Sequence, residues 1–266
     1  MEAWMKRVMT LAEKATQEHH QNTGLDDRHQ LDENTVTKSN ALARSYYRFG
    51  LVEKRVMESS ISMLNPLQFN QWGTQELELR AVDYAKAFNV SEHRAYDDLK
   101  SAIDCMLNRV ITVNESEKKI LKYPLMSKAE YNSGKGSITI EFNRHLVHHL
   151  IGLREKFTSY PLQKAVNFSS SYTWRLYEIF ASWAQSKKVT NGVFLGWFTV
   201  SVDELRQQMG MPETYQWVHV NDTLTKATDE LWEKARIKTV ITRTKTSRKI
   251  THLKFEFCED QQQSLI

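Results

Sequence analysis

The 266-residue sequence has little of what disulfide-rich or membrane proteins depend on. Its two cysteines, Cys105 and Cys258, are far apart and have no metal-type or redox-type spacing. This usage is typical of a reducing compartment, where thiols stay free. No run approaches the ~20 apolar residues of a membrane span, and charged residues interrupt the N-terminal region where a signal peptide would need an apolar core. We expect a cytoplasmic protein that does not contact a membrane.

The motifs of common enzyme classes are also missing. The sequence at 133–137, Ser-Gly-Lys-Gly-Ser, resembles part of a phosphate-binding loop, but the complete spacing is absent. His145, His148 and His149 have a spacing that can hold a metal on one helix face, although a solvated helix is the simpler interpretation. The metal-binding histidine motif of rolling-circle replication nucleases does not occur. We therefore expect no metal, no cofactor and no catalytic activity.

The charge is distributed unevenly. The net charge of +4 by itself says little about partners. Between residues 236 and 254, however, there are basic residues and no acidic one, namely Arg236, Lys238, Arg243, Lys245, Arg248, Lys249 and Lys254. Such an imbalance favours contact with a polyanion, although a well-solvated hairpin would look the same.

One order of elements occurs twice after a polar stretch at 17–38, which predicts a mobile linker. Before this stretch, apolar residues at 4–12 predict a short amphipathic helix. The first copy is expected to begin with a helix whose apolar face starts at Tyr46 and which Asn65-Pro66 stops. A strand at 77–80 follows.

The next elements of the first copy predict a helix-turn-helix. A helix at 82–88 turns and restarts at Ser91, whose hydroxyl can cap a third helix reaching about Leu107. The β-rich residues 109–113 and 137–142, with a glycine-containing turn at 132–136, then predict a hairpin beside it, which is a wing.

The second copy follows the same plan. It predicts a helix at 169–184, a strand at 194–200, a helix capped by Ser201 and ended by Gly210, and a longer helix at 219–235. Residues 237–243 and 250–257 predict its hairpin. Tryptophans in these periodic segments, including Trp174, Trp183, Trp197 and Trp232, are expected to be buried.

The fold class expected from this repetition is α+β, with two tandem winged-helix domains. The expected divisions are an N-terminal extension at 1–38, partly disordered, a first winged-helix domain at 39–155 and a second at 156–266.

The third helix of each copy is the candidate for reading DNA, because the major groove is ~12 Å wide and admits one α-helix. In the second copy, donor and acceptor side chains lie at or near its N-terminal half, while Asp229, Glu230 and Glu233 lie at its other end. The first copy has fewer basic residues there. The candidate DNA contacts are Gln216, His219, Asn221, Asp222, Thr225, Lys226, Arg243, Lys245, Arg248, Lys249, His93 and Arg94. For both helices, the competing interpretation is that polar residues simply face water.

Five stretches carry a resemblance to a known family. They are Ser39-Asn-Ala-Leu, Leu51-Val-Glu-Lys-Arg, Asp83-Tyr-Ala-Lys-Ala-Phe with Ala95-Tyr and Leu99-Lys, Phe157-Thr-Ser-Tyr, and Ser171-Tyr-Thr-Trp-Arg-Leu-Tyr-Glu. Over roughly 38–257 the sequence resembles the theta-type plasmid replication initiators, or Rep proteins, which have two winged-helix domains. The resemblance implies binding of double-stranded DNA at direct repeats (iterons) of an origin, opening of a neighbouring AT-rich segment, contact with the host initiator and helicase, and repression of its own gene as a homodimer.

Two other functions stay open on physical grounds. A winged-helix transcription regulator without a role in replication needs the same DNA-reading surface. A metal-dependent replication nuclease is a third interpretation, which the absence of the histidine motif disfavours. Only the resemblance distinguishes an initiator from a repressor.

Overall fold

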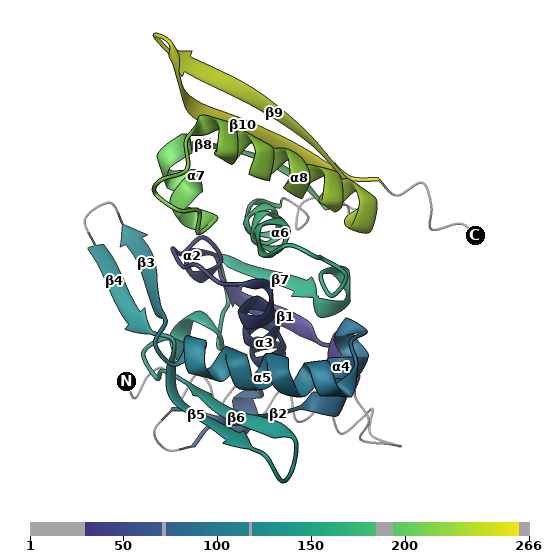
Figure 1. Ribbon diagram of the computed structural model, residues 1–266. Helices are drawn as coiled ribbons and strands as arrows, with labels where there is room; N and C mark the ends of the chain where they lie inside the picture. Colours follow the sequence, from purple (N-terminus) through teal and green to yellow (C-terminus); the bar gives the residue numbers. More distant parts are fainter. Residues whose placement is uncertain (1–29, 71–72, 117–118, 185–193, 261–266) are drawn as a thin grey trace. The chain divides into compact units, whose positions relative to one another are not determined.

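The computed structural model describes residues 30–70, 73–116, 119–184 and 194–260 (Figure 1). The chain divides into two compact units, each formed from two stretches of sequence. Unit 1 contains the residues up to Leu42 together with Val52–Val166. Unit 2 contains Ala43–Leu51 and the residues from Asn167 onward. Of the described residues, no helix is long and apolar enough to cross a membrane.

The predicted mobile linker is wrong in its last part. After a 3-10 turn at Leu31–Glu33, strand β1 (Thr35–Ser39) pairs in antiparallel register with β7 (Phe157–Pro161), and helix α2 (Asn40–Ala43) follows. Val36 of β1 is buried opposite Tyr160. The partner strand lies more than 100 residues away, so no local pattern could indicate it. Residues 1–29, including the predicted helix at 4–12, lie outside the described residues.

A buried ionic cluster joins three elements of unit 1. Lys38 of β1 and Lys54 of α3 (Leu51–Ser62) each place Nζ 2.6 Å from a carboxylate oxygen of Glu58. The Tyr160 hydroxyl of β7 donates to the same carboxylate at 3.1 Å. Both lysines and Glu58 are fully buried, and buried charges are stable in a protein only when they are paired in this way.

The first helix begins later than predicted, at Leu51 rather than near Tyr46. Residues 45–50 are not helical and belong to unit 2, where Arg175 of α6 (Ser171–Trp183) binds them. The buried Arg175 guanidinium donates to the carbonyls of Ala43 and Ser45 and to the Tyr47 hydroxyl, and it also pairs with Glu178. These tertiary contacts outweigh the helical spacing of the local apolar residues.

The helix-turn-helix of unit 1 is confirmed. Helix α4 (Ala81–Phe88) ends at Asn89, which has a left-handed backbone conformation with φ 49°. Helix α5 (Glu92–Met106) then begins, and the Ser91 side chain accepts a hydrogen bond from the Arg94 amide, as expected of a cap.

The strand pairing predicted in unit 1 is wrong. The observed sheet has the order β2-β6-β5, with β2 at Glu76–Arg80, β5 at Met126–Asn132 and β6 at Ser137–Phe142. Strand β3 (Val110–Ser116) pairs instead with β4 (Lys119–Pro124) in a hairpin of its own. Strands β4 and β5 have few buried positions, so their apolar alternation is too weak to be read from sequence. The turn at 132–136 does connect β5 and β6 as a wing.

The histidine-containing segment also differs from the prediction of a solvated helix. It forms a 3-10 turn, Val147–His149, in which His149 is buried and places Nδ1 2.9 Å from the Ser39 hydroxyl. Nowhere in the described ranges are three or more His, Cys, Asp or Glu side chains grouped so that they could hold a metal ion.

Unit 2 contains the elements predicted for the second copy. A 3-10 turn at Leu162–Lys164 closes unit 1, and α6 then begins after Ser170, whose side chain caps it. The following elements are β8 (Leu195–Ser201), α7 (Val202–Gln208), α8 (Trp217–Ala235), β9 (Ile237–Thr246) and β10 (Lys249–Glu259), with the sheet order β8-β10-β9. Ser201 caps α7, and Gly210 follows the helix with φ 65°.

Gly210 is required for a second reason. A Cβ at this position would lie 2.5 Å from the carbonyl oxygen of Tyr47 in the segment that Arg175 holds. A side chain other than hydrogen would therefore push this segment away.

The compact units do not coincide with a division of the chain at residue 155. Residues 43–51 belong to unit 2, and β7 belongs to unit 1.

The tryptophan prediction is correct for one residue only. Trp174 is fully buried, whereas Trp183, Trp197 and Trp232 are exposed. Each exposed ring has a cation near its face, namely Arg44 for Trp183, Lys254 for Trp197, and Arg236 with Lys238 for Trp232. Helical or strand spacing identified these positions as regular structure but did not decide which side of the element faces solvent.

Candidate nucleic-acid interface

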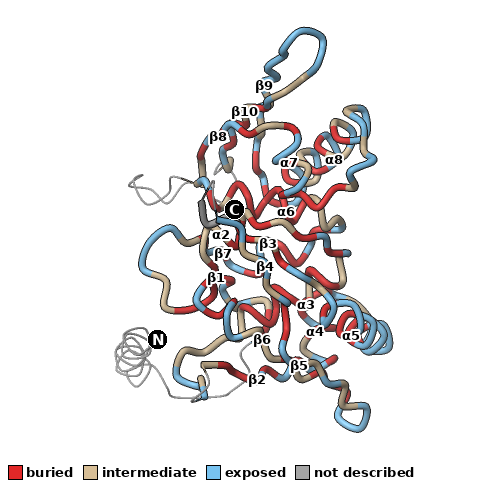
Figure 2. The backbone as a smooth tube through the Cα atoms, turned by 90° about the vertical axis from the view of Figure 1, so that its left-hand side faces the viewer, coloured by how far each residue is buried: buried red, intermediate tan, exposed pale blue. Residues whose placement is uncertain are grey.

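Helix α8 has one buried face and one exposed face. Its buried residues Val220, Leu224, Ala227 and Leu231 recur at helical spacing, and the helix packs against α6. This packing leaves the opposite face in solvent (Figure 2). Gln216 precedes the helix and its side chain makes no capping hydrogen bond. An uncapped helix N-terminus carries partial positive charge, which suits a nearby phosphate.

The β9–β10 hairpin, which is the wing of unit 2, is connected to α8 through Arg243. This residue of β9 donates a hydrogen bond from Nη2 to Oδ1 of Asn221 at 2.8 Å, and its guanidinium lies 5.7 Å from the centre of the Trp217 ring. Two predicted DNA contacts from different elements are thus brought together. The Trp217 ring thereby supports the Arg243 side chain.

The middle of the exposed face has a paired charge. Lys226 and Asp222 form an ion pair at 2.9 Å in which both side chains are largely exposed. This pairing offsets the repulsion that an isolated Asp222 would exert on phosphate, while a carboxylate can still accept a hydrogen bond from cytosine. Thr225 donates its hydroxyl hydrogen to the Asn221 backbone carbonyl at 3.0 Å, so the exposed Thr225 side chain has an acceptor and a methyl group left for a ligand. His219 is exposed, with its ring beside Tyr215.

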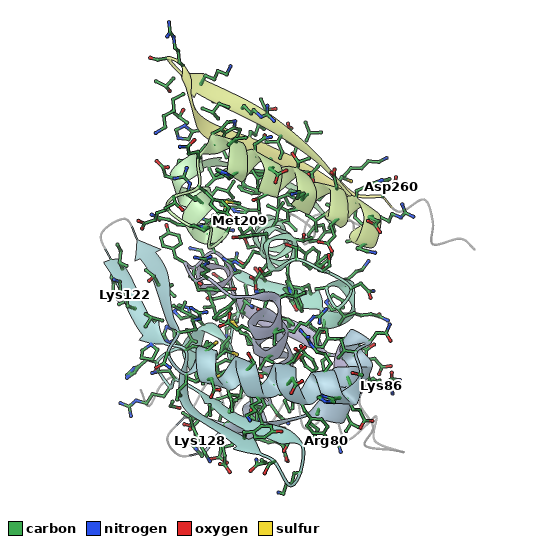
Figure 3. All side chains as sticks on the ribbon, in the orientation of Figure 1. Arg80, Lys86, Lys122, Lys128, Met209 and Asp260 are labelled. Atoms are coloured by element: carbon green, nitrogen blue, oxygen red, sulfur yellow. The ribbon has the colours of Figure 1, made fainter. Side chains whose placement is uncertain are left out.

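The positive charge of the wing is concentrated at its tip. Lys245, Arg248 and Lys249 are exposed around the turn, where Ser247 has φ 57°. Among the residues that the structure describes, no carboxylate lies within ion-pair distance of these three. Asp260, labelled in Figure 3, follows β10 at the other end of the hairpin and pairs with Lys238. Lys254, in the middle of β10 opposite Thr242, is paired with Glu256. The unneutralised charge therefore lies on the part of the hairpin that extends furthest from the core.

The acids at the far end of α8 have a structural role that the sequence did not predict. Glu230 accepts hydrogen bonds from the Ser169 amide at 2.6 Å, from the Ser169 hydroxyl at 2.7 Å and from Thr173. It thereby fixes the start of α6 to α8. Glu233 pairs with Lys234, which raises the pKa of Lys234.

The corresponding helix of unit 1, α5, is less suited to DNA. His93 is exposed, and its Nδ1 lies 3.4 Å from Oδ2 of Asp97. Arg94 pairs at 2.8 Å with Asp98, a buried carboxylate that also accepts a hydrogen bond from Tyr84. Burial and this carboxylate raise the pKa of Tyr84. Arg94 thus compensates a buried charge, and whether it also contacts DNA stays a prediction.

Comparisons with known proteins agree with this architecture. Residues 35–181 match the family model described as "Initiator Replication protein, WH1", and residues 201–257 match "Initiator Rep protein, WH2". The chain belongs to the initiator replication protein family. The two winged-helix domains expected from the repeated order of elements are confirmed by these two matches.

Two proteins of Escherichia coli are similar in sequence to this chain. The PI protein is 26% identical over 269 residues, covering 87% of this chain and 86% of the relative. An uncharacterised 27.6 kDa protein is 26% identical over 162 residues, covering 57% of this chain and 67% of the relative. The solved structure of "Pi initiator protein in complex with iteron DNA" superposes with a TM-score of 0.70 at 22% identity, covering 86% of this chain and 99% of that one. That similarity shows a shared fold.

One exposed residue of α8 was missed by sequence reasoning. Val218 was not selected because it is apolar and lies next to apolar positions. Only its position in the helix could have indicated that it faces outward. Val218 lies two residues before the buried Val220, and residues two apart in a helix lie on nearly opposite faces.

Proposed function

We propose that this initiator starts plasmid replication by binding double-stranded DNA at direct repeats, or iterons, of the origin. The observation that carries the proposal is the continuous surface of α8 and the β9–β10 wing, joined by Arg243 and Asn221. Helix α8 is placed to enter the major groove with its N-terminal half, and the wing tip supplies charge for the phosphates. The related Pi protein was solved with iteron DNA, which supports the same ligand class here.

The partners follow from the same proposal. The protein would act in the cytoplasm, help to open an AT-rich segment, contact the host initiator and helicase, and repress its own gene as a homodimer. None of these steps needs bond chemistry from the protein itself, since binding free energy is sufficient to deform DNA and to position partners.

The test combines DNA binding with replication. Purified protein is footprinted on the DNA flanking its gene, and the same segment is placed on a plasmid that lacks any other origin. We expect protection of several direct repeats, each about two helical turns long, and maintenance of the plasmid only when the protein is supplied. Protection of a site near the promoter without plasmid maintenance would indicate a transcription regulator, and metal-dependent nicking of the DNA would indicate a nuclease.

A further inference from the structure

Val218 is the most exposed large hydrophobic side chain of the described residues, with 64% of its surface accessible. It lies in the first turn of α8, between the half-buried Trp217 and the exposed His219. An aliphatic side chain gains nothing from facing water, and helix formation itself favours other residues over valine. The packing of unit 2 therefore does not account for Val218.

The position of Val218 on the helix is central to the exposed face. Val218, Asp222 and Thr225 are spaced at i, i+4 and i+7, so they form one stripe opposite the buried residues. Asn221, held by Arg243, lies on one side of this stripe, and Lys226, paired with Asp222, lies near its other side. Val218 is thus an apolar site within a surface of hydrogen-bonding groups.

The edges of the base pairs have one matching group. In the major groove, hydrogen-bond donors and acceptors dominate, and the 5-methyl group of thymine is the apolar feature. Valine in a helix has essentially one side-chain rotamer, so its two methyl groups are held in place before binding. Little conformational entropy is lost when such a side chain contacts a base.

We propose that Val218 contributes to sequence specificity by packing against the 5-methyl group of a thymine in the recognised site. This inference rests on the proposed binding of DNA by α8 and adds the base feature that one residue reads. The remaining polar residues of the stripe would contact the neighbouring bases.

The experiment removes the 5-methyl group from the thymine and the two methyl groups of the Val218 side chain. The full chain first selects its preferred site from duplexes randomised over about two helical turns. In the selected duplex, each thymine is then replaced singly by deoxyuridine, which keeps every hydrogen-bonding group of the base. Affinities are measured for the wild type, for Val218→Ala and for Val240→Ala.

Val240 provides the matched control. It is a valine of the same unit with 61% of its surface exposed, but it lies on β9 opposite Glu256 rather than on α8. Neither substitution removes a buried side chain, and thermal melting of both variants verifies that they fold.

We expect deoxyuridine at one or two positions to weaken wild-type binding about threefold to fivefold, the effect of one methyl group removed from water. Val218→Ala should bind the thymine duplex correspondingly more weakly and should no longer distinguish thymine from deoxyuridine there, whereas Val240→Ala should behave as the wild type. If a site is selected but Val218→Ala keeps the full methyl effect, the inference is wrong while the proposed function stands. If no site is selected at all, the proposed function itself fails.

Discussion

At the scale of single residues, the candidate interface depends on side chains that position one another. The side-chain oxygen Oδ1 of Asn221 accepts a hydrogen bond from Arg243, which leaves the side-chain NH2 group of Asn221 available to a base. The reading surface is therefore organised before DNA arrives, and this reduces the entropic cost of binding.

Replacing Asn221, Thr225 and Lys226 singly by alanine should reduce sequence discrimination. Each good base contact is worth roughly 1 to 3 kcal/mol, so affinity for the selected site should fall about fivefold to 150-fold more than affinity for random DNA. The measurement is a titration of both duplexes at one salt concentration. A parallel fall in both affinities would identify the residues as phosphate contacts.

Residue-scale stability is most sensitive at Glu58. Glu58→Gln removes the carboxylate that two buried ammonium groups share, which should lower the free energy of unfolding by about 3–5 kcal/mol. Chemical denaturation measures this change. Glu130→Gln, which alters an exposed ion pair with Lys128 in the same unit, should change the free energy of unfolding far less, because water screens exposed charges. Equal effects of the two variants would show that the buried cluster is not stabilising.

At the scale of elements, the β9–β10 hairpin separates a charged tip from a neutralised base. Neutralising a phosphate releases counterions, so the tip should determine how strongly binding depends on salt. Lys238 at the base of the hairpin and Lys254 at its middle are paired with carboxylates, so they should matter much less.

Replacing Lys245, Arg248 and Lys249 together by glutamine should lower affinity for specific and random duplexes alike. The slope of log affinity against log salt should become shallower by about 0.9 for each phosphate that the wing no longer neutralises. The control variant carries Lys238→Gln and Lys254→Gln, which change two paired cations of the same hairpin away from its tip. An unchanged slope in the tip variant would exclude the wing as a phosphate-binding element.

Glu230 tests how α6 and α8 are held together. Glu230→Ala leaves the Ser169 amide and the buried Thr173 hydroxyl without their acceptor, which should destabilise the fold by about 1–3 kcal/mol. Exposed Asp229→Ala on the same helix is the control, with little expected change. Denaturant unfolding distinguishes the two.

At the scale of the whole molecule, the chain passes between its two units three times, near residues 42, 51 and 166. A cut between 155 and 156 would separate β7 from β1 and would leave 43–51 apart from Arg175. We expect halves made by this cut to lack cooperative unfolding, as measured by circular dichroism during heating. Two stable halves would contradict the structural role of both interactions.

The contribution of unit 1 to DNA binding is therefore better tested in the intact chain. His93→Glu with Lys100→Glu adds negative charge to the exposed face of α5 without altering the Arg94–Asp98 pair. If both units bind one DNA site, binding of the second unit is intramolecular and strengthens the whole complex. The double variant should then bind the selected site at least tenfold more weakly, and its footprint should be shorter. An unchanged footprint would assign DNA binding to unit 2 alone.

The sequence by itself determined the order of the longer helices and the elements of unit 2, because these depend on local rules. Ser91, Ser201 and Gly210 mark helix ends through their own backbone and side-chain chemistry, and the buried face of α8 follows from helical spacing. The repetition of this order was enough to predict two winged helices. Local charge at 236–254 likewise predicted that this hairpin is a candidate for binding phosphate.

Only the tertiary structure decided which segments pair across long separations and which side chains face out. The apolar spacing from Tyr46 onward predicts a helix, but the buried Arg175 binds the Ser45 carbonyl and the Tyr47 hydroxyl, and this segment is not helical. Strand β1 has the composition of a polar linker, and it becomes a strand because its partner β7, more than 100 residues later, buries Lys38 beside Glu58. The exposure of Val218 is equally a result of packing, since it depends on how α6 covers the opposite side of α8. Burial and long-range pairing are properties of the assembled chain, and a linear pattern can only limit them.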